Sequence, residues 1–250
     1  MKQKNTLRLF CIPYAGGSVS IYRNWPNCLP KAIEVCPIEL PGRGNRSKEN
    51  LFNNLLSLVK TLAKDILHSL DKPFAFFGHS MGALISFELA RFLRRKNNLS
   101  PIHIFVSGRC APQIPRSKPP INQLPEAEFV EELCRLNGMP GSVLQNSELM
   151  ELMLPVIRAD FAICETYSYS VEEPLECSIS AFGGLQDNEV NREEIVAWSQ
   201  QTRKGFTYRM FPGDHFFLKS NEELLLRAIA QDITPHLNNI IKNNSNNYSV

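Results

Sequence analysis

The strongest constraint on the fold is an alternation of short apolar segments with amphipathic helical patterns. Leucines and other apolar residues between Leu55 and Leu70 recur three and four positions apart, which predicts a helix. The continuous apolar run at 73–77 is typical of a strand buried on both faces of a parallel sheet. Other strands are predicted at Thr6–Ile12, Ala32–Leu40 and Ile102–Val106, and another helix at Ala83–Arg95. Together these segments predict an α/β fold with a mostly parallel central sheet flanked by helices.

The alternation stops after residue 110. Residues 111–125 contain five prolines and predict an irregular connection, followed by helices at Glu126–Leu136 and Ser147–Tyr167 around a turn at 138–141. It then resumes with a strand at Cys177–Gly183, a helix around Arg192–Gln201, a strand at Phe206–Phe211 and a helix at Glu222–Leu237. We therefore expect a core of residues 1–110 and 176–240, an inserted helical lid at 111–175 and a disordered tail at 241–250. An ordinary crossover with a decorated surface is the alternative to a lid.

The lid segment carries more apolar side chains than its outer face alone needs, among them Phe129, Leu133, Met153, Ile157 and Phe161. We expect some of them to line a passage to the site, and the segment to move between open and closed positions. Simple packing onto the core is the alternative for any one of these residues.

Composition excludes several classes of protein. The 27 Lys and Arg balance 25 Asp and Glu, for a net charge of +2, which gives no indication of nucleic-acid binding. No run approaches the length of a membrane span, and the N-terminus lacks the apolar region of a secretory signal. The seven cysteines include no C-x-x-C pair, which favours reduced thiols in the cytoplasm over disulfides or zinc. With no phosphate-binding loop or ligand cluster, we expect no metal, nucleotide or redox cofactor.

Residues Gly78–Gly82 form a G-x-S-x-G sequence directly after a predicted buried strand and directly before a predicted helix. In that context the motif is typical of a sharp turn that exposes the serine hydroxyl above the sheet edge. The flanking glycines leave room where a Cβ would clash. Ser80 is the predicted nucleophile.

A serine nucleophile needs a base, and the base needs an acid that orients it. His215 lies in a turn directly after the last predicted strand. His79 adjoins Ser80, and its side chain is expected to point away from the hydroxyl. The other three histidines are expected to be structural or on the surface (His68, His103 and His236). Asp187 follows the strand before it, so the chain order is serine, acid, histidine, as in α/β-hydrolases. Glu189 remains a minor alternative for the acid, and Asp214 is disfavoured because it adjoins the histidine.

An oxyanion hole requires two backbone N–H groups aimed at the developing negative charge. Met81, the residue after the nucleophile, is expected to supply one. The other is expected from the loop after the first strand, with Ala15 as the first choice and Tyr14 as the second. Gly16 and Gly17 would let that backbone approach a ligand closely, although a glycine pair is also compatible with a plain flexible turn.

Five segments then carry a resemblance in register, from about residue 7 to about residue 235: Pro13–Ser18, Leu40–Gly44, Phe77–Ala83, Ser107–Pro112 and Gly213–Phe217. They resemble the type II thioesterases of nonribosomal peptide and polyketide assembly lines. The resemblance implies an α/β-hydrolase with a flexible helical lid that clears stalled or mis-primed acyl groups from the phosphopantetheine arm of carrier proteins.

By the same resemblance, Ser80, Asp187 and His215 form the triad, and the amides of Ala15 and Met81 form the oxyanion hole. Further substrate contacts are expected from Tyr14, Gly16, Gly17 and Phe216. The chain departs from the family at Tyr14, where many members have histidine, and at Cys110, where a basic residue or proline is common. Either change is expected to alter the pocket wall without touching the triad.

Without the resemblance, the residues predict only a serine hydrolase with a lid, because a triad does not distinguish thioester, ester and amide substrates. A general acyl-coenzyme A or ester hydrolase, a product-releasing thioesterase and a non-catalytic carrier-binding module remain alternatives. We expect a cytoplasmic monomer that meets acidic carrier proteins transiently through Lys118 and the Arg43/Arg46 loop. The basic Arg91–Lys96 segment is interpreted as charge that complements a helix C-terminus.

Overall fold

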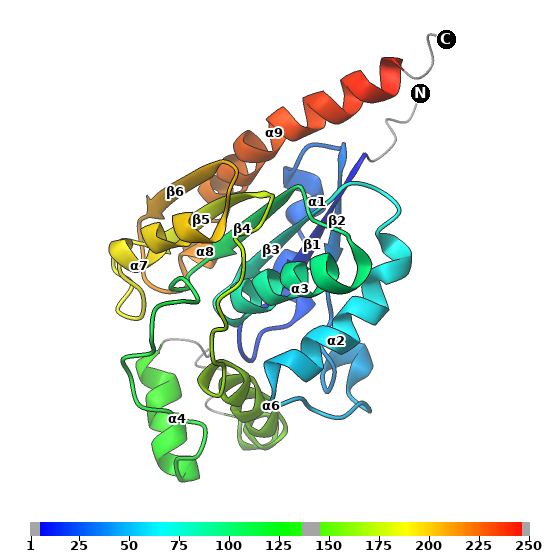
Figure 1. Cartoon of the computed structure of the whole chain (residues 1–250). Coiled ribbons are helices and arrows are strands. Elements are labelled where there is room, and N and C mark those ends of the chain that lie inside the picture. The colour runs from blue at the N-terminus through cyan, green and yellow to red at the C-terminus, as the bar shows by residue number, and fades with distance from the viewer. Residues whose placement is uncertain (1–5, 137–145, 247–250) are drawn as a thin grey trace.

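A six-stranded parallel sheet forms the centre of the molecule (Figure 1). The computed structural model describes residues 6–136 and 146–246, so the turn expected at 138–141 and the last four residues of the expected tail lie outside the described residues. The strand order is β2-β1-β3-β4-β5-β6, and every neighbouring pair is parallel. The strands are β1 (Leu7–Ile12), β2 (Ile33–Pro37), β3 (Phe74–His79), β4 (His103–Ser107), β5 (Ser178–Gly184) and β6 (Phe206–Phe211). The predicted α/β fold class is confirmed.

Helices cover both faces of the sheet, and each face has its own apolar core. One face packs against α2 and α3, and the other against α1 and α9. The helices are α1 (Trp25–Cys28), α2 (Leu55–Ile66), α3 (Met81–Asn97), α4 (Glu126–Arg135), α6 (Ser147–Glu165), α7 (Arg192–Val196), α8 (Phe217–Ser220) and α9 (Glu222–Asn246). Short 3-10 turns lie at Val19–Tyr22, Gly44–Arg46, Leu67–Ser69 and Ala197–Gln201. None of the helices within 6–136 and 146–246 has both the length and the apolar character needed to cross a membrane.

The predicted helix after residue 54 forms because its local signals agree. The Asn54 side chain accepts a hydrogen bond from the Ser57 N–H at 3.1 Å, which satisfies one of the free donors of the first turn. The apolar stripe of α2 is buried against the sheet and against α3. The helix ends at Ile66, four residues before the last apolar position of the predicted pattern, and continues as a 3-10 turn.

The last helix extends further than the sequence predicted. α9 runs to Asn246 rather than ending near Leu237, so residues 241–246 belong to a helix and not to a disordered tail. Asparagine lowers helix propensity by only a few tenths of a kcal/mol relative to average residues, and no glycine follows Leu237 to end the helix. The asparagine-rich composition was therefore a poor guide to the helix end.

Helices α4 and α6 lie together beyond one end of the sheet, on the opposite side of the molecule from the end of α9 (Figure 1). They share a small apolar cluster that is separate from the two cores, and its buried members include Phe129, Leu133, Met150, Leu154 and Ile157. By contrast, Leu152 on α6 is 73% exposed. The segment therefore has a core of its own, whereas its motion stays a prediction.

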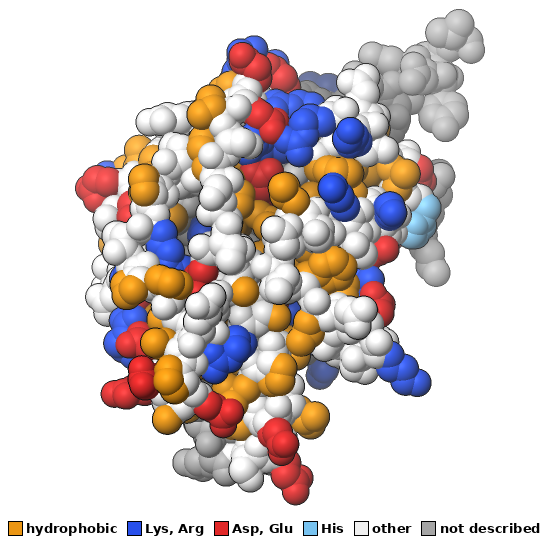
Figure 2. All heavy atoms as spheres, turned by 60° about the horizontal axis from the view of Figure 1, so that its bottom comes forward, with side chains coloured by type: hydrophobic (Ala, Val, Ile, Leu, Met, Phe, Trp, Pro, Cys, Tyr) orange, Lys and Arg blue, Asp and Glu red, His pale blue; other side chains and the backbone are white. Residues whose placement is uncertain are grey.

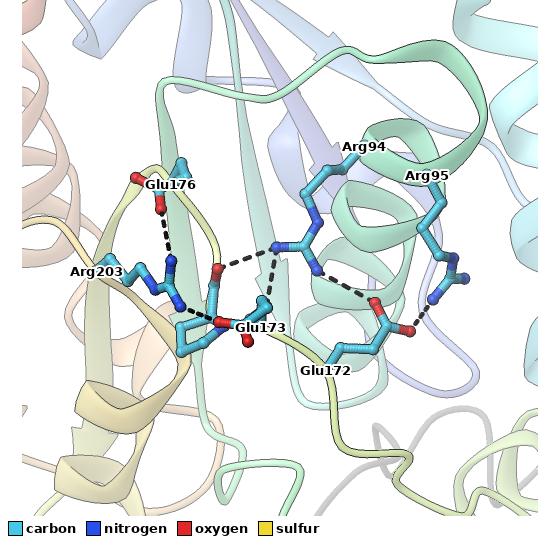
Figure 3. Close-up of a pocket in the computed structure, with 7 residues that line it drawn as sticks. Arg94, Arg95, Glu172, Glu173, Glu176 and Arg203 are labelled. Atoms are coloured by element: carbon cyan, nitrogen blue, oxygen red, sulfur yellow. Dashed lines mark hydrogen bonds and ion pairs between the residues drawn. The ribbon is translucent and has the colours of Figure 1, made fainter.

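The basic end of α3 does more than complement the helix dipole. Arg91 is buried and donates to the Ser170 carbonyl at 2.6 Å. Arg94 donates to the Pro174 carbonyl at 3.0 Å, and both Arg94 and Arg95 form ion pairs with Glu172 (Figure 3). These contacts fasten the chain that returns from the lid onto α3, so the dipole interpretation was incomplete.

The turn between β3 and α3 is the most crowded part of the backbone. A Cβ at Gly78 would overlap the carbonyl of Gly82, and a Cβ at Gly82 would overlap the carbonyl oxygen of Ile12 at the end of β1. Both clashes are with backbone, which cannot rotate away. The two glycines of the serine motif are therefore required by packing of α3 against β1 and β3.

A buried polar cluster lies away from this turn, at the start of β4. The ring of His103 is within hydrogen-bond distance of Ser180 Oγ (2.8 Å) and His236 Nε2 (3.2 Å), and Ser180 also donates to Asp232 at 2.7 Å. Burial, with a smaller effect of His236, lowers the pKa of His103 to about 3. His103 and Ser180 are both buried, which fits the structural role expected for this histidine.

We expect Gly82→Ala to destabilise the protein by at least about 2 kcal/mol, although alanine alone would favour a helix by about 1 kcal/mol. The reason is the overlap with the Ile12 carbonyl. Gly205→Ala is the matched control, because the nearest atom to a Cβ there is Ser178 Oγ at 3.4 Å. Urea unfolding of the two variants checks this, and equal stability would contradict the packing argument.

His103 also makes stability depend on pH. Because its pKa is depressed in the folded state, the unfolded chain binds more protons between the two pKa values, about 3 and about 6.5. Its contribution is therefore complete above pH 6.5 and is lost as the pH falls, by about 2 kcal/mol between pH 7.5 and pH 5. In His103→Gln the stability difference between these pH values should shrink by that amount in urea titrations. His68→Gln, at an exposed position, should leave it unchanged.

Candidate active site

Ser80 occupies the sharp turn from β3 into α3. Its φ of 52° and ψ of −112° lie in a region that residues with side chains rarely adopt. The Ser80 N–H donates to the Ser107 carbonyl at the end of β4 at 2.7 Å, and this bond holds the turn in place. The side chain is half-buried and lines a cavity at the carboxyl ends of the strands.

His215 and Asp187 meet in the loops that follow β6 and β5. His215 Nδ1 lies 2.8 Å from Asp187 Oδ2, and the aspartate side chain is fully buried. The other carboxylate oxygen accepts the N–H groups of Glu189 at 2.8 Å and Val190 at 3.3 Å. These bonds orient the carboxylate, which in turn holds the imidazole at the wall of the cavity that Ser80 also lines.

The two rival acids have other partners. Glu189 forms ion pairs with Lys118 at 2.7 Å and with Arg135 at 3.6 Å. Asp214 accepts the N–H of Phe216 at 2.8 Å, which closes a local turn. Of these three carboxylates, Asp187 is the one within hydrogen-bond distance of the His215 ring.

His79, next to the serine, is a packing residue. Its ring lies 5.2 Å from that of His215, and its Nδ1 is 2.9 Å from Ser107 Oγ. Burial, and then the nearby His215 and Lys219, lower the pKa of His79 well below its usual value. A neutral His79 therefore sits beneath the site and supports the His215 ring.

The loop after β1 lines the same cavity as Ser80. Gly17 N–H donates to the Tyr14 carbonyl at 2.8 Å, which forms a tight turn, and Gly16 N–H donates to Asp160 Oδ2 at 2.8 Å. The N–H groups of Ala15 and Met81 make no hydrogen bond within the described parts of the chain. Both are therefore available to bind an oxyanion, and that role stays a prediction.

The cavity has a volume of about 910 Å³. The core contributes the expected contact residues to its wall, namely Tyr14, Ala15, Gly16, Gly17, Ser80, His215 and Phe216. The lid contributes apolar side chains, namely Leu133, Leu136, Met153, Ile157 and Phe161. All five also belong to the lid cluster, so that cluster forms one wall of the cavity.

Two cysteines, Cys110 and Cys164, also line the cavity. Burial raises the pKa of both thiols. Because the thiolate is the reactive form of cysteine, a raised pKa makes both thiols less reactive than a free cysteine.

The three basic residues expected to meet a carrier protein, Arg43, Arg46 and Lys118, have different surroundings. The Arg43 side chain is 11% exposed and forms a bidentate ion pair with Asp160 of α6, so the prediction that Arg43 meets a carrier is wrong. Arg46 is held by Glu49 and Asp65. Lys118 lines the cavity and is partly exposed, and there it joins Arg116 and Lys219. The face with the lid in front shows hydrophobic side chains between charges of both signs (Figure 2).

Sequence reasoning missed Asp160 and Lys219. The ammonium group of Lys219 lies 5.1 Å above the Tyr14 ring and 4.8 Å above the Phe216 ring, two of the expected substrate contacts. A carboxylate within the apolar pattern of α6 was the available signal for Asp160. Its partners are far away in sequence and had no signal.

A comparison with protein families supports the chemistry of this site. The model of the thioesterase domain matches residues 7–234. The chain belongs to the thioesterase family. This thioesterase is 50% identical to the gramicidin S biosynthesis protein GrsT of Aneurinibacillus migulanus over 227 residues, which are 91% of the chain and 89% of GrsT.

Two further relatives match over a similar share of the chain. The thioesterase is 47% identical to LgrE of Brevibacillus parabrevis, named linear gramicidin dehydrogenase, over 92% of the chain and 88% of LgrE. Among solved structures, the type II thioesterase BorB from the borrelidin biosynthetic cluster superimposes with a TM-score of 0.83 at 35% identity. The match covers 90% of the chain and 92% of BorB.

We expect Asp187→Asn to lower kcat by about 10³- to 10⁴-fold, because the amide holds the wrong imidazole tautomer. Ser80→Ala and His215→Ala should cost at least as much, since the three groups act as a unit. Steady-state hydrolysis of an acyl thioester measures these values. Glu189→Gln is the control and should retain most of kcat; the reverse order for Asp187 and Glu189 would contradict the assignment.

Proposed function

We propose that this thioesterase removes stalled or aberrant acyl groups from the phosphopantetheine arm of carrier proteins in a peptide or polyketide assembly line. The observation that carries the proposal is that the Asp187–His215 pair and Ser80 meet at one large cavity, whose wall also includes apolar residues of the lid. The relatives add the pathway class, since GrsT is named for gramicidin S biosynthesis and BorB is a type II thioesterase.

The mechanism follows from the assigned roles. His215 Nε2 takes the Ser80 hydroxyl proton as Oγ attacks the thioester carbonyl carbon, and the new oxyanion accepts hydrogen bonds from the N–H groups of Ala15 and Met81. The carbon–sulfur bond then breaks, and the imidazolium returns its proton to the departing thiol sulfur. Water, deprotonated by His215, next attacks the acyl-serine and releases the carboxylic acid and free Ser80. No step requires a cofactor or metal, so EDTA should not change the rate.

The cavity suits an acyl chain that enters on a long arm. Its lid wall is apolar, while Arg116, Lys118 and Lys219 supply positive charge to its lining. Carrier proteins are generally acidic near the modified serine. Long-range attraction to such a surface would raise the rate of encounter, and the arm would then deliver the thioester to Ser80.

The dehydrogenase name of LgrE does not change the proposal. The turn after β1 reads Pro-Tyr-Ala-Gly-Gly-Ser and lacks the G-x-G-x-x-G pattern of dinucleotide-binding turns. Its Gly16 N–H already binds Asp160. Acyl transfer through Ser80 therefore accounts for the site better than hydride transfer does.

The cysteines bear on where the enzyme works. All seven cysteines are free, which fits a reducing cytoplasm. We place the enzyme there as a monomer that meets carriers transiently. A general acyl-coenzyme A or ester hydrolase remains the second candidate, because the same triad would hydrolyse those bonds.

We expect kcat/KM for a carrier-bound acyl group to exceed that for the same acyl group on coenzyme A by about tenfold at low salt, because remote contacts orient the thioester. The advantage should decrease as salt is raised. Lys118→Ala should lower the carrier value up to about fivefold, as for a partly exposed ion pair. Lys60→Ala, on the exposed side of α2, should not. Equal values for the two substrates would favour the general hydrolase.

A further inference from the structure

One buried ion pair joins the lid to the loop that carries Ala15. Asp160 lies on α6, and its side chain is 1% exposed. Each carboxylate oxygen is 2.6 Å from one terminal nitrogen of Arg43. Oδ2 also accepts the Gly16 N–H at 2.8 Å. The lid helix, the loop after β2 and the loop after β1 therefore converge on a single carboxylate.

The contact also has a packing component. A Cβ at Gly16 would lie 2.9 Å from Ile157 Cγ1, and Gly16 has a φ of 71°. Ile157 and Asp160 are three residues apart, so they project from the same face of α6. The lid helix thus rests directly on the glycine turn, through one apolar and one charged side chain.

Stability alone is a weak explanation for this pair. A buried ion pair seldom stabilises a fold more than an apolar pair of similar volume would. Here the Nε of Arg43 is buried without a hydrogen-bond partner in the described structure, which adds a further cost. The consequence that remains is geometric, since a bidentate pair fixes the positions and orientations of both groups.

The geometry points to Asp160 and Arg43 as positioning residues for the oxyanion hole, an inference that rests on the proposed role of the Ala15 N–H. The Ala15 N–H belongs to the planar peptide unit between Tyr14 and Ala15, whose carbonyl accepts the Gly17 N–H. The bond from the Gly16 N–H to Asp160 fixes the next peptide plane, between Ala15 and Gly16, so the two planes that meet at Ala15 are both held. Ala15 lines the same cavity as Ser80, and on this inference its N–H keeps the orientation needed for an oxyanion while α6 is seated on the turn.

The test separates oxyanion binding from substrate entry. With a carrier-independent acyl ester as substrate, Asp160→Ala should lower kcat about 10- to 100-fold and change KM less than about threefold. This is below the 10²- to 10³-fold loss for removing a whole oxyanion donor. An alkyl trifluoromethyl ketone, which forms a negatively charged adduct on Ser80, should lose affinity by the same factor as kcat. A thioether analogue that cannot react should bind unchanged.

The control is Arg158→Gln on the same helix. Arg158 donates to the carbonyls of Asn122 and Leu124 at 2.5 and 2.9 Å and does not reach the glycine turn. It should leave kcat and the ketone affinity unchanged. The double variant Asp160→Asn with Arg43→Gln removes both buried charges but keeps an oxygen that can accept the Gly16 N–H. It should recover part of the kcat lost in Asp160→Ala, and it carries the comparison if that variant does not fold.

Two results would overturn the inference. One is wild-type kcat and ketone affinity in Asp160→Ala or, if that variant does not fold, in Arg43→Gln. The other is a loss confined to KM, which would mean that the pair controls entry to the cavity. Failure to hydrolyse carrier-bound substrates would refute the proposed function without affecting this comparison, since the ester contains no carrier.

Discussion

The packing of α3 against the ends of β1 and β3 is the constraint on which the rest of the site depends. It holds Ser80 at a φ of 52°, and it leaves no room for a Cβ at Gly78 or Gly82. The strain is sustained because the Ser80 N–H is bound to the end of β4 and because β3, which precedes the turn, is buried along its whole length. The serine hydroxyl is thereby fixed at the carboxyl edge of the sheet, where the loops that follow β1, β5 and β6 also begin.

A parallel sheet brings these loops together without any of them being close in sequence. Because every strand runs in the same direction, the carboxyl ends of β1, β3, β5 and β6 lie along one edge. These loops then supply the N–H of Ala15, which makes no hydrogen bond within the described residues, together with Ser80, the buried side chain of Asp187 and the His215 ring. The C-terminal part of α6 is tied to the core by the ion pair of Asp160 with Arg43, while Glu165 at its last position pairs with Arg116 of the preceding irregular segment.

The buried and the exposed basic residues of this thioesterase have different roles. The buried Arg43 and Arg91 bind lid and post-lid segments, and most other arginines near them are paired as well. The basic residues left along the cavity wall are few, and they are mixed with acids. Any attraction to an acidic partner is therefore a property of the cavity entrance rather than of the whole surface.

The sequence by itself determined the succession of strands and helices along the chain and the turn that carries Ser80. It also singled out Asp187 and His215 as candidates for the acid and the base. These features are local: a strand is recognised by its apolar run, and a loop residue by its place directly after a strand. It also overestimated disorder at the C-terminus, where composition outweighed the absence of a helix stop. Only the tertiary structure decided the partners of Arg43, Arg91 and Asp160. Arg43 and Asp160 are 117 positions apart, and no local pattern encodes a contact that forms when the lid packs onto the core. That contact changed Arg43 from an expected surface residue into a buried one.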